Sequence, residues 1–311
     1  MNYSAVCTPE LGSDLEQLVD LFNQIFPVKH TPESLLAKYS APPDSMSWHG
    51  LMKDDSRLVG AMTVIPVEYR YFGEPCTFGC FVDLMIDPDA RGDMLSFKKI
   101  YDAVMELIGD RMDLAYAVPN DNAYLYFRKF LKWDEICDLY YYVMPVKVGA
   151  LKSKLKILDL ASRPGSLLYS MLPSLSSSSP VEKGISKINS DDFRTFRFAD
   201  EYDVGEAAGA LFWYRLWEED NGAQVCYIVD IDPLSPRTLD AAAAFLRRKV
   251  SCDAIMYVDS ARLGPHKMIR VPRKSEPRNL HLIVKPVTDR VDDRVLDAAN
   301  WQFNLADFDV R

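Results

Sequence analysis

Asp83 is the residue of this sequence best suited to acid–base chemistry, because it stands inside an otherwise apolar, strand-like run from Phe81 to Ile86. A carboxylate in such a run is unfavourable unless it has a partner or a function. Burial raises the pKa of a carboxyl group, which suits a general base. The alternative is a structural carboxylate that accepts hydrogen bonds from backbone N–H groups or from a tyrosine hydroxyl.

Tyrosines on a downstream segment could supply the matching acid. Tyr126 is the first candidate and Tyr124 the second, since a phenol can donate a proton to a leaving group. Tyrosines at helical spacing also pack against sheets, so a structural role stays open for both. His49, beside Trp48 on an early strand, could line an acceptor cleft or be a hydrogen-bonded core histidine.

The residues after Ile86 form a turn between a strand and a helix, with the sequence Asp87-Pro88-Asp89-Ala90-Arg91-Gly92. Such a turn directs several backbone N–H groups to one point at the positive end of the helix dipole, which favours phosphate. Arg91 adds a forked donor, and Gly92 lets the backbone approach a ligand closely. A solvated loop cation is the alternative interpretation of Arg91.

This stretch resembles the acyl-CoA-binding core of GNAT-type N-acyltransferases. The family has a hydrophobic residue, a proline and an Arg-Gly pair in this turn, which are matched here by Ile86, Pro88, Arg91 and Gly92. The next strand is followed by Asn120 and Asn122 and then by an aromatic-rich helix, as in the family.

The resemblance covers residues 1–148 in the order of elements, and residues 81–133 carry its motifs. Residues 58–89 are also similar to the front half of GNAT-like proteins associated with bacterial surface-polysaccharide genes. Four positions depart from the family pattern. Met94 and Lys132 stand where glycine is usual, and Ser96 stands at the final Gly/Ala position of the loop. The register of the family's tyrosine acid falls at Arg128.

The resemblance implies an acyl-CoA, most simply acetyl-CoA, as co-substrate, with Asp83 as base and Tyr126 as acid. The residues expected to hold the cofactor are Ile86, Arg91, Gly92, Asp93, Met94, Leu95, Ser96, Asn120 and Asn122. For Asn120 and Asn122, a role as simple turn residues is the alternative.

The elements that must position these residues follow the order βααβββαβαβ over residues 1–148. Three strand-like runs, joined by short turns, predict an antiparallel meander over residues 47–86. We therefore predict an α/β (α+β) fold, in which helices flank a mostly antiparallel GNAT-like sheet in a domain at residues 1–150.

The rest of the chain predicts a basic, Ser-rich linker at residues 151–190 and a smaller α/β domain at residues 191–311. A degenerate second GNAT-like half is one interpretation of that domain. We expect a helix near residues 205–219, whose aromatic run, Phe212–Trp217, packs in the core or forms an acceptor platform.

Composition excludes several classes of protein. The net charge of −9 argues against a protein that binds nucleic acid on a basic face. No run approaches the roughly 18 apolar residues of a membrane span, and the N-terminus lacks the basic start of a signal peptide, so a cytoplasmic protein is expected. The lysines of the linker are too few to predict peripheral membrane contact. The six cysteines show no metal-ligand spacing, so neither a metal nor a disulfide is expected.

The predicted function is the transfer of an acyl group from CoA to an amine on a small molecule or a glycan precursor. Two alternatives remain open. One is a non-catalytic binding or scaffold protein of the same shape, which Met94 and Lys132 favour. The other is an aminoacyl-transferring enzyme with tandem GNAT-like halves, which the negative charge opposes.

Overall fold

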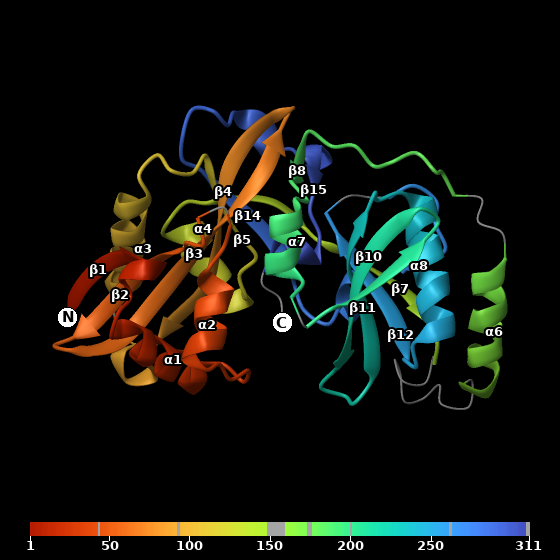
Figure 1. Ribbon diagram of the computed structural model, residues 1–311, viewed down its shortest axis with the longest axis horizontal. Helices are drawn as coiled ribbons and strands as arrows, with labels where there is room; N and C mark the ends of the chain where they lie inside the picture. Colours follow the sequence, from red (N-terminus) through yellow and green to blue (C-terminus); the bar gives the residue numbers. More distant parts are fainter. Residues whose placement is uncertain are drawn as a thin grey trace. The chain divides into compact units, whose positions relative to one another are not determined.

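The computed structural model of the chain is drawn in Figure 1, coloured from the N-terminus to the C-terminus. Among the residues that the structure describes, no helix is long and apolar enough to cross a membrane. Gly92, Asp93 and the basic run at 151–158 lie outside the described residues. Described are residues 1–42, 44–91, 94–147, 159–172, 176–199, 201–260 and 263–308, with their side chains except those of residues 94 and 159–163.

The chain folds into two compact units, each assembled from separate stretches of sequence. Unit 1 comprises Met1–Cys137, Gly184–Arg197 and Leu280–Asn300, and unit 2 comprises Asp138–Lys183, Phe198–Asn279 and Trp301–Arg311. This division differs from the continuous domains at 1–150 and 191–311 expected from the sequence. The chain leaves unit 1 after Cys137 and returns to it twice, so the expected linker contributes residues to both units.

Unit 1 begins with the order βααβββαβαβ that the sequence pattern predicts. Its elements are β1 (Asn2–Cys7), α1 (Asp14–Ile25), α2 (Pro32–Tyr39), β2 (Trp48–Asp54), β3 (Arg57–Tyr71), β4 (Glu74–Ile86), α3 (Met94–Ile108), β5 (Leu114–Ala117), α4 (Asp121–Lys129) and β6 (Asp134–Asp138), followed later in the chain by β8 (Ile185–Lys187), α7 (Asp191–Arg197) and β14 (His281–Pro286).

The sheet of unit 1 has the strand order β1-β2-β3-β4-β5-β14-β6, and β8 pairs with β3. The ladders from β1 to β4 are antiparallel, and so is the ladder between β5 and β14. The ladder between β4 and β5 is parallel, because α3 carries the chain back across the sheet between them. The predicted meander and the mostly antiparallel character of the sheet are confirmed.

The strand β14 lies between β5 and β6 although about 150 residues separate it from both in the sequence. β6 ends at Asp138, and the next strand, β7 (Tyr140–Pro145), joins the sheet of unit 2 instead. A place in the first sheet is thus filled by residues 281–286, which no local pattern could have assigned to this unit.

Helices cover both faces of the first sheet. A Cβ atom added at Gly50 of β2 would lie 2.7 Å from the carbonyl oxygen of Ile100, so α3 packs directly on this strand. The neighbouring residue His49 points to the opposite face, and its ring contacts Tyr39 of α2 with 4.8 Å between ring centroids. Therefore α3 covers one face of the sheet and α2 covers the other.

Unit 2 contains a second sheet, with the strand order β13-β7-β12-β11-β10-β9. In Figure 1, α6 and α8 of this unit lie side by side. Besides β7, its elements are α6 (Asp159–Met171), β9 (Asp203–Ala207), β10 (Ala210–Glu218), β11 (Gln224–Asp232), α8 (Pro236–Lys249), β12 (Ala254–Asp259), β13 (Ile269–Arg270) and β15 (Trp301–Gln302).

The prediction of a helix near residues 205–219 is wrong, because this segment is the antiparallel hairpin of β9 and β10. The two residues between the strands, Ala208 and Gly209, have φ values of 52° and 78°. Two successive residues with positive φ match the twist of a two-residue hairpin turn and end any helix. Phe212–Trp217 accordingly lies on a strand, with Phe212 in the core of unit 2 and Leu216 exposed.

Candidate functional site

Asp83 lies at a β-bulge in β4. The ladder with β3 shifts by one residue there, so that Asp83 and Leu84 together oppose the single residue Met62. Asp83 has a φ of 49°, which costs a residue with a side chain roughly 1 kcal/mol. Bulges of this kind turn a side chain away from the face that the regular strand would give it.

The bulge directs Asp83 to the face of the sheet that α2 covers. Phe81 packs in the core formed with α3 and α4, and so do Leu84 and Ile86. In a regular strand Phe81 and Asp83 would share a face. The extra residue inverts the alternation, and Asp83 contacts Tyr39 of α2 instead.

Two side chains at the end of α2 hold the Asp83 carboxylate. Lys38 Nζ lies 3.0 Å from Oδ1 and 2.8 Å from Oδ2, and the Tyr39 hydroxyl donates to Oδ2 at 2.8 Å. The Asp83 side chain is 7% exposed. The helix that presents these groups starts with the predicted cap, in which Thr31 Oγ1 accepts the Ser34 N–H. The predicted tyrosine partner of Asp83 is therefore present, together with a cation that the sequence analysis did not include.

The turn after β4 is held by its own side chains. Asp87 is buried, forms an ion pair with Arg57 and accepts the N–H of Asp89 at 3.0 Å. The N–H of Asp87 donates to the carbonyl of Val59 at 2.8 Å. These contacts fix the end of β4 against β3, and with it the start of the short turn Pro88–Ala90.

Arg91 and Leu95 are the exposed members of the predicted cofactor set on this segment. Arg91 Nε donates to the carbonyl of Ile86 at 2.9 Å, so the side chain folds back over the turn. Leu95 is 60% exposed in the first turn of α3. Gly92, Asp93 and the side chain of Met94 lie outside the described residues, so their predicted contacts stay predictions.

Ser96 is placed differently from the other predicted cofactor residues. Its side chain is buried, and Oγ forms a hydrogen bond of 2.9 Å with the hydroxyl of Tyr3. This bond ties α3 to β1. The Ser96 hydroxyl therefore has a structural partner, whereas its backbone N–H still lies in the first turn of the helix, where N–H groups favour anions.

The ladder between β4 and β5 ends before β4 does. Its pairs run from Phe78 with Leu114 to Cys80 with Tyr116, whereas β4 continues to Ile86. The strands are parallel, so their carboxyl ends lie at one edge of the sheet, where ligands of open α/β sheets bind. The β4 backbone beyond Cys80 can therefore offer N–H and C=O groups to an extended ligand.

Asn120 and Asn122 stand at the start of α4, at the same edge. Asn120 is the N-cap, and its side-chain oxygen accepts the N–H of Ala123 at 2.9 Å. Asn122 is exposed in the first turn. The turn-and-cap interpretation therefore accounts for Asn120, and a contact between either asparagine and the cofactor stays a prediction.

Tyr126 points its ring into the apolar contact between α3 and α4. Its ring centroid lies 5.5 Å from that of Phe97 and 6.1 Å from that of Phe130. This is the packing role that the sequence analysis left open for aromatic residues on this helix. The arrangement favours Tyr124 over Tyr126 as the hydroxyl available for chemistry.

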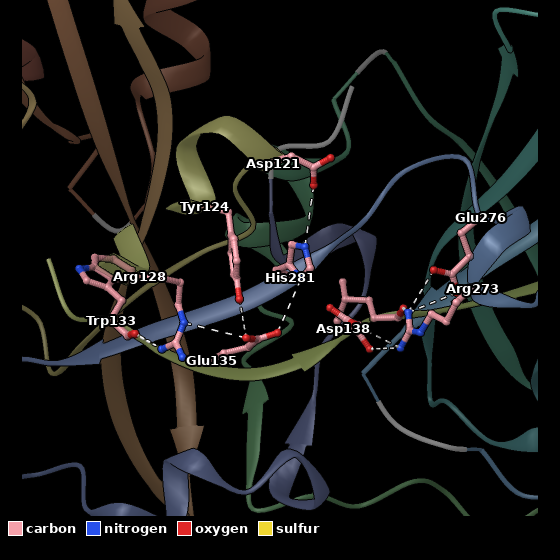
Figure 2. Close-up of polar contacts among 10 residues, drawn as sticks. Asp121, Tyr124, Arg128, Trp133, Glu135, Asp138, Arg273, Glu276 and His281 are labelled. Atoms are coloured by element: carbon pink, nitrogen blue, oxygen red, sulfur yellow. Dashed lines mark hydrogen bonds and ion pairs between the residues drawn. The ribbon is translucent and has the colours of Figure 1, made fainter. Parts of the chain in front are cut away.

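Tyr124 joins a polar network with Glu135 of β6 and His281 of β14, as Figure 2 shows. The Tyr124 hydroxyl donates to Glu135 Oε2 at 2.5 Å, and its ring stacks on that of His281 with 4.2 Å between centroids. His281 Nδ1 lies 3.6 Å from Glu135 Oε1. Burial and the Glu135 carboxylate raise the pKa of Tyr124, so the hydroxyl keeps its proton near neutral pH.

Arg128 lies one helical turn after Tyr124 and faces the same carboxylate. Its Nε is 3.9 Å from Glu135 Oε2, and its guanidinium donates to the carbonyl of Trp133 (Figure 2). Residues four apart share one face of a helix. Tyr124 and Arg128 therefore share one face of α4. The resembled family has its tyrosine at the position of Arg128, and in this chain Tyr124 brings a hydroxyl to that face.

The pairing register of β14 with β5 places the Tyr124–Glu135–His281 network at the edge of the sheet where β4 and β5 end. His281 stands two residues before Ile283, which pairs with Ala117, the last residue of β5. His281 therefore lies just past the carboxyl end of β5. The Tyr124–Glu135–His281 network and the Asp83 bulge are on strands of one sheet, and both lie beyond the end of the β4–β5 ladder.

His49 is a structural residue. It is fully buried, with Nε2 3.0 Å from Thr8 Oγ1 and Nδ1 3.0 Å from Thr63 Oγ1. Burial lowers its pKa to about 3, so the ring is neutral near pH 7. The interpretation as a hydrogen-bonded core histidine holds.

The sequence analysis missed four residues of this site: Lys38, Tyr39, Glu135 and His281. Lys38 and Tyr39 end an amphipathic helix, and their distance from Asp83 in the sequence gives no sign of contact. Glu135 could have been found, because it lies on the strand directly after α4. His281 could not, because it depends on the return of residues 281–286 to the first sheet.

Three solved structures share this fold over most of the chain. A GCN5-related N-acetyltransferase from Anabaena variabilis is 11% identical and covers 92% of this chain and 73% of its own, with a TM-score of 0.54. One from Kribbella flavida is 11% identical and covers 91% and 71%, with a TM-score of 0.55. A protein of unknown function from Enterococcus faecalis, described as a probable N-acyltransferase, is 13% identical and covers 92% and 72%, with a TM-score of 0.53.

These identities are low enough that the likeness shows the fold alone. No protein-family model matches the chain, and no curated protein matches it in sequence. The chain therefore has the fold of GCN5-related N-acetyltransferases. The prediction of helices around mostly antiparallel sheets is confirmed.

Proposed function

We propose that this protein is an N-acyltransferase that moves an acyl group, most simply acetyl, from CoA to an amine. The observation that carries the proposal is Asp83, a carboxylate 7% exposed, held in a left-handed conformation on the bulge of β4. Strained residues of this kind persist where the surrounding structure fixes them, and they gather at functional sites. The fold shared with N-acetyltransferases supports the same activity.

In this proposal the cofactor lies along β4 and against the start of α3. The pantetheine arm of CoA is extended and carries amides, so it can form hydrogen bonds with the strand beyond Cys80. The pyrophosphate accepts N–H groups at the start of α3, near Leu95 and Ser96, where the helix dipole favours negative charge. Arg91 can turn from the carbonyl of Ile86 to the phosphate, since its side chain is exposed.

Asp83 and Tyr124 divide the proton transfers between them. Asp83 takes a proton from the acceptor ammonium, which frees the nitrogen lone pair for attack on the thioester carbonyl. Tyr124 protonates the thiolate that leaves, and the contacts to Glu135 and His281 hold its hydroxyl in place. Tyr126, the acid expected from the sequence, is the second candidate for this role.

The proposed acceptor is an amine on a small molecule or on an amino-sugar precursor of a glycan. A protein with a net charge of −9 attracts cationic molecules, which fits an ammonium-bearing acceptor. The amino sugar rests on the resemblance to GNAT-like proteins associated with surface polysaccharides.

A second candidate function is binding without catalysis. The ion pair of Asp83 with Lys38 favours it, because it engages the carboxylate that catalysis needs. A binding protein of this kind could retain the cofactor and lack turnover.

Thermal unfolding with and without CoA tests the proposal. At a hundredfold excess over the dissociation constant, CoA and acetyl-CoA should each add about 2.7 kcal/mol to the free energy of unfolding. ATP at the same concentration is the control for a general effect of phosphates. A well-folded sample that millimolar CoA does not stabilise would rule out the acyltransferase and leave only binding of another ligand.

A further inference from the structure

An amine of the protein itself lies beside the proposed base. Lys38 Nζ contacts both carboxylate oxygens of Asp83, at 3.0 and 2.8 Å, and lies 5.0 Å from the centroid of the Phe22 ring. The Lys38 side chain is 18% exposed, so its long stem is confined as well as its charge. This ammonium takes the position that an acceptor ammonium must take before Asp83 can remove its proton.

We propose that Lys38 is a self-acylation site, at which the protein transfers an acyl group from its own bound acyl-CoA. The proposal rests on the proposed function, because it needs both the cofactor beside β4 and Asp83 as the base. It assigns a modification site and a form of regulation to a residue that the acyl transfer itself does not require.

The reaction balances with the groups at hand. The Lys38 ammonium gives one proton to Asp83, and the neutral nitrogen attacks the thioester carbonyl carbon. The C–S bond then breaks, and the second proton of the nitrogen goes to the leaving thiolate through Tyr124 or water. The products are an amide at Lys38, the free thiol of CoA and a protonated Asp83, which returns its proton to water.

Acylation would change the site in a definite way. An amide carries no charge, so the ion pair between Lys38 and Asp83 is lost while the Tyr39 hydrogen bond remains. The acyl group would also occupy space beside Asp83 that an external amine must enter. Self-acylation at Lys38 should therefore slow transfer to external acceptors.

The chain offers a matched control in Lys53. Its Nζ lies 2.7 and 2.8 Å from the two oxygens of Asp14, and the two side chains are 28% and 16% exposed. Lys53 therefore has the same kind of partner and similar burial. Asp14 lies at the start of α1 and not on the bulge of β4, so the proposal gives its carboxylate no thioester.

The test is incubation of the full-length protein with acetyl-CoA, followed by proteolysis and mass spectrometry of the peptides that contain Lys38 and Lys53. We expect acetylation to accumulate at Lys38 well ahead of Lys53. Asp83→Asn should slow it at Lys38 by about a hundredfold or more, as for other lost general bases. Lys38→Arg should remove the signal, and Lys53→Arg should leave it unchanged.

Competition with CoA keeps the test independent of variants that fail to fold. Excess CoA, which carries no acyl group, should suppress acetylation at Lys38 and leave the background at Lys53 as it was. Equal acetylation of both lysines, or no suppression by CoA, would overturn the inference. If acetyl-CoA stabilises the protein but Lys38 stays unmodified, this inference fails while the acyltransferase stands; if acetyl-CoA does not bind, both fail.

Discussion

The two units of this protein build the same arrangement around their parallel strands. In unit 1 the antiparallel strands β2, β3 and β4 lead through α3 to β5, and in unit 2 the strands β9, β10 and β11 lead through α8 to β12. Both parallel ladders stop early, at Cys80 in β4 and at Ile228 in β11. Each is followed by a bulge, at Asp83 in unit 1 and at Val229 in unit 2.

The region beyond the parallel ladder differs between the units. In unit 2 the C-terminal segment fills it, since Asn304 bridges to Asp259 and donates to Asp230 Oδ1 at 2.8 Å. Asn304, Asp230 and Asp259 are all buried. The start of α8 is closed as well, because Ser235 and Thr238 cap it with buried side chains.

In unit 1, side chains around the start of α3, those of Arg91 and Leu95, are exposed instead. In unit 1 this arrangement carries the proposed binding edge, whereas in unit 2 the chain itself fills the corresponding region. That unit 2 is a degenerate second GNAT-like half stays a prediction.

The largest expected difference between the units concerns their carboxylates. Asp83→Asn should lower acetyl transfer from acetyl-CoA to a panel of amines by roughly 10²–10⁴-fold, because the variant cannot accept a proton. Asp230→Asn, the matched change in unit 2, should lower the melting temperature but leave the rate per folded molecule unchanged. Initial rates and melting temperatures should be measured on the same preparations.

An Asp83→Asn protein that loses stability but keeps normal turnover per folded molecule would remove Asp83 from catalysis. If Asp230→Asn loses more turnover than folded protein, unit 2 contributes to activity as well as to stability.

The next prediction concerns the stability of unit 2. It tests whether the C-terminal segment is part of the core of that unit. Asn304→Ala removes the hydrogen bond to Asp230 and the one that Oδ1 accepts from the Ala306 N–H at 2.9 Å. Each buried group left without its bond costs about 1–3 kcal/mol, so calorimetry should show a large drop in the unfolding temperature. Asn300→Ala, which removes an exposed amide contact to the Arg294 carbonyl, is the control and should have little effect. An equal, small effect of both would contradict a structural role for the segment.

Local patterns were enough to predict the first ten elements of unit 1. Caps such as Thr31 and turns such as Gly73–Pro75 determine element ends within a few residues. The hairpin at residues 203–218 was missed because its turn uses Ala208, a residue that rarely takes positive φ. The unit boundaries were missed because the return of β14 to the first sheet depends on tertiary pairing.

The candidate site was predictable in part. Asp83 stood out as a charge in an apolar strand, and a tyrosine partner for it was foreseen. Lys38 could not be found, because the bulge reverses the face of Asp83 and no sequence period reports a bulge. The choice between Tyr124 and Tyr126 likewise required the positions of Glu135 and Phe97.

The smallest expected effect concerns a departure from the resembled family. Lys132 has a φ of 56° and is exposed, so the glycine usual at this position relieves backbone strain. Lys132→Gly should raise the free energy of unfolding by about 1 kcal/mol. The same change at Lys129, in the last turn of α4, should lower it. Denaturant titration of both variants checks the signs, and stabilisation by neither would show that strain at Lys132 is negligible.

The central claim is that acyl-CoA binds at unit 1 and that unit 2 is closed to it, and calorimetric titration of CoA tests this most directly. We predict one site per chain. Leu95→Glu, which places a carboxylate in the first turn of α3, should abolish binding by repelling the pyrophosphate without harming the helix. Arg237→Glu, the matched change at an exposed residue in the first turn of α8, should leave binding unchanged. Two sites per chain, or binding lost with Arg237→Glu and kept with Leu95→Glu, would contradict the claim.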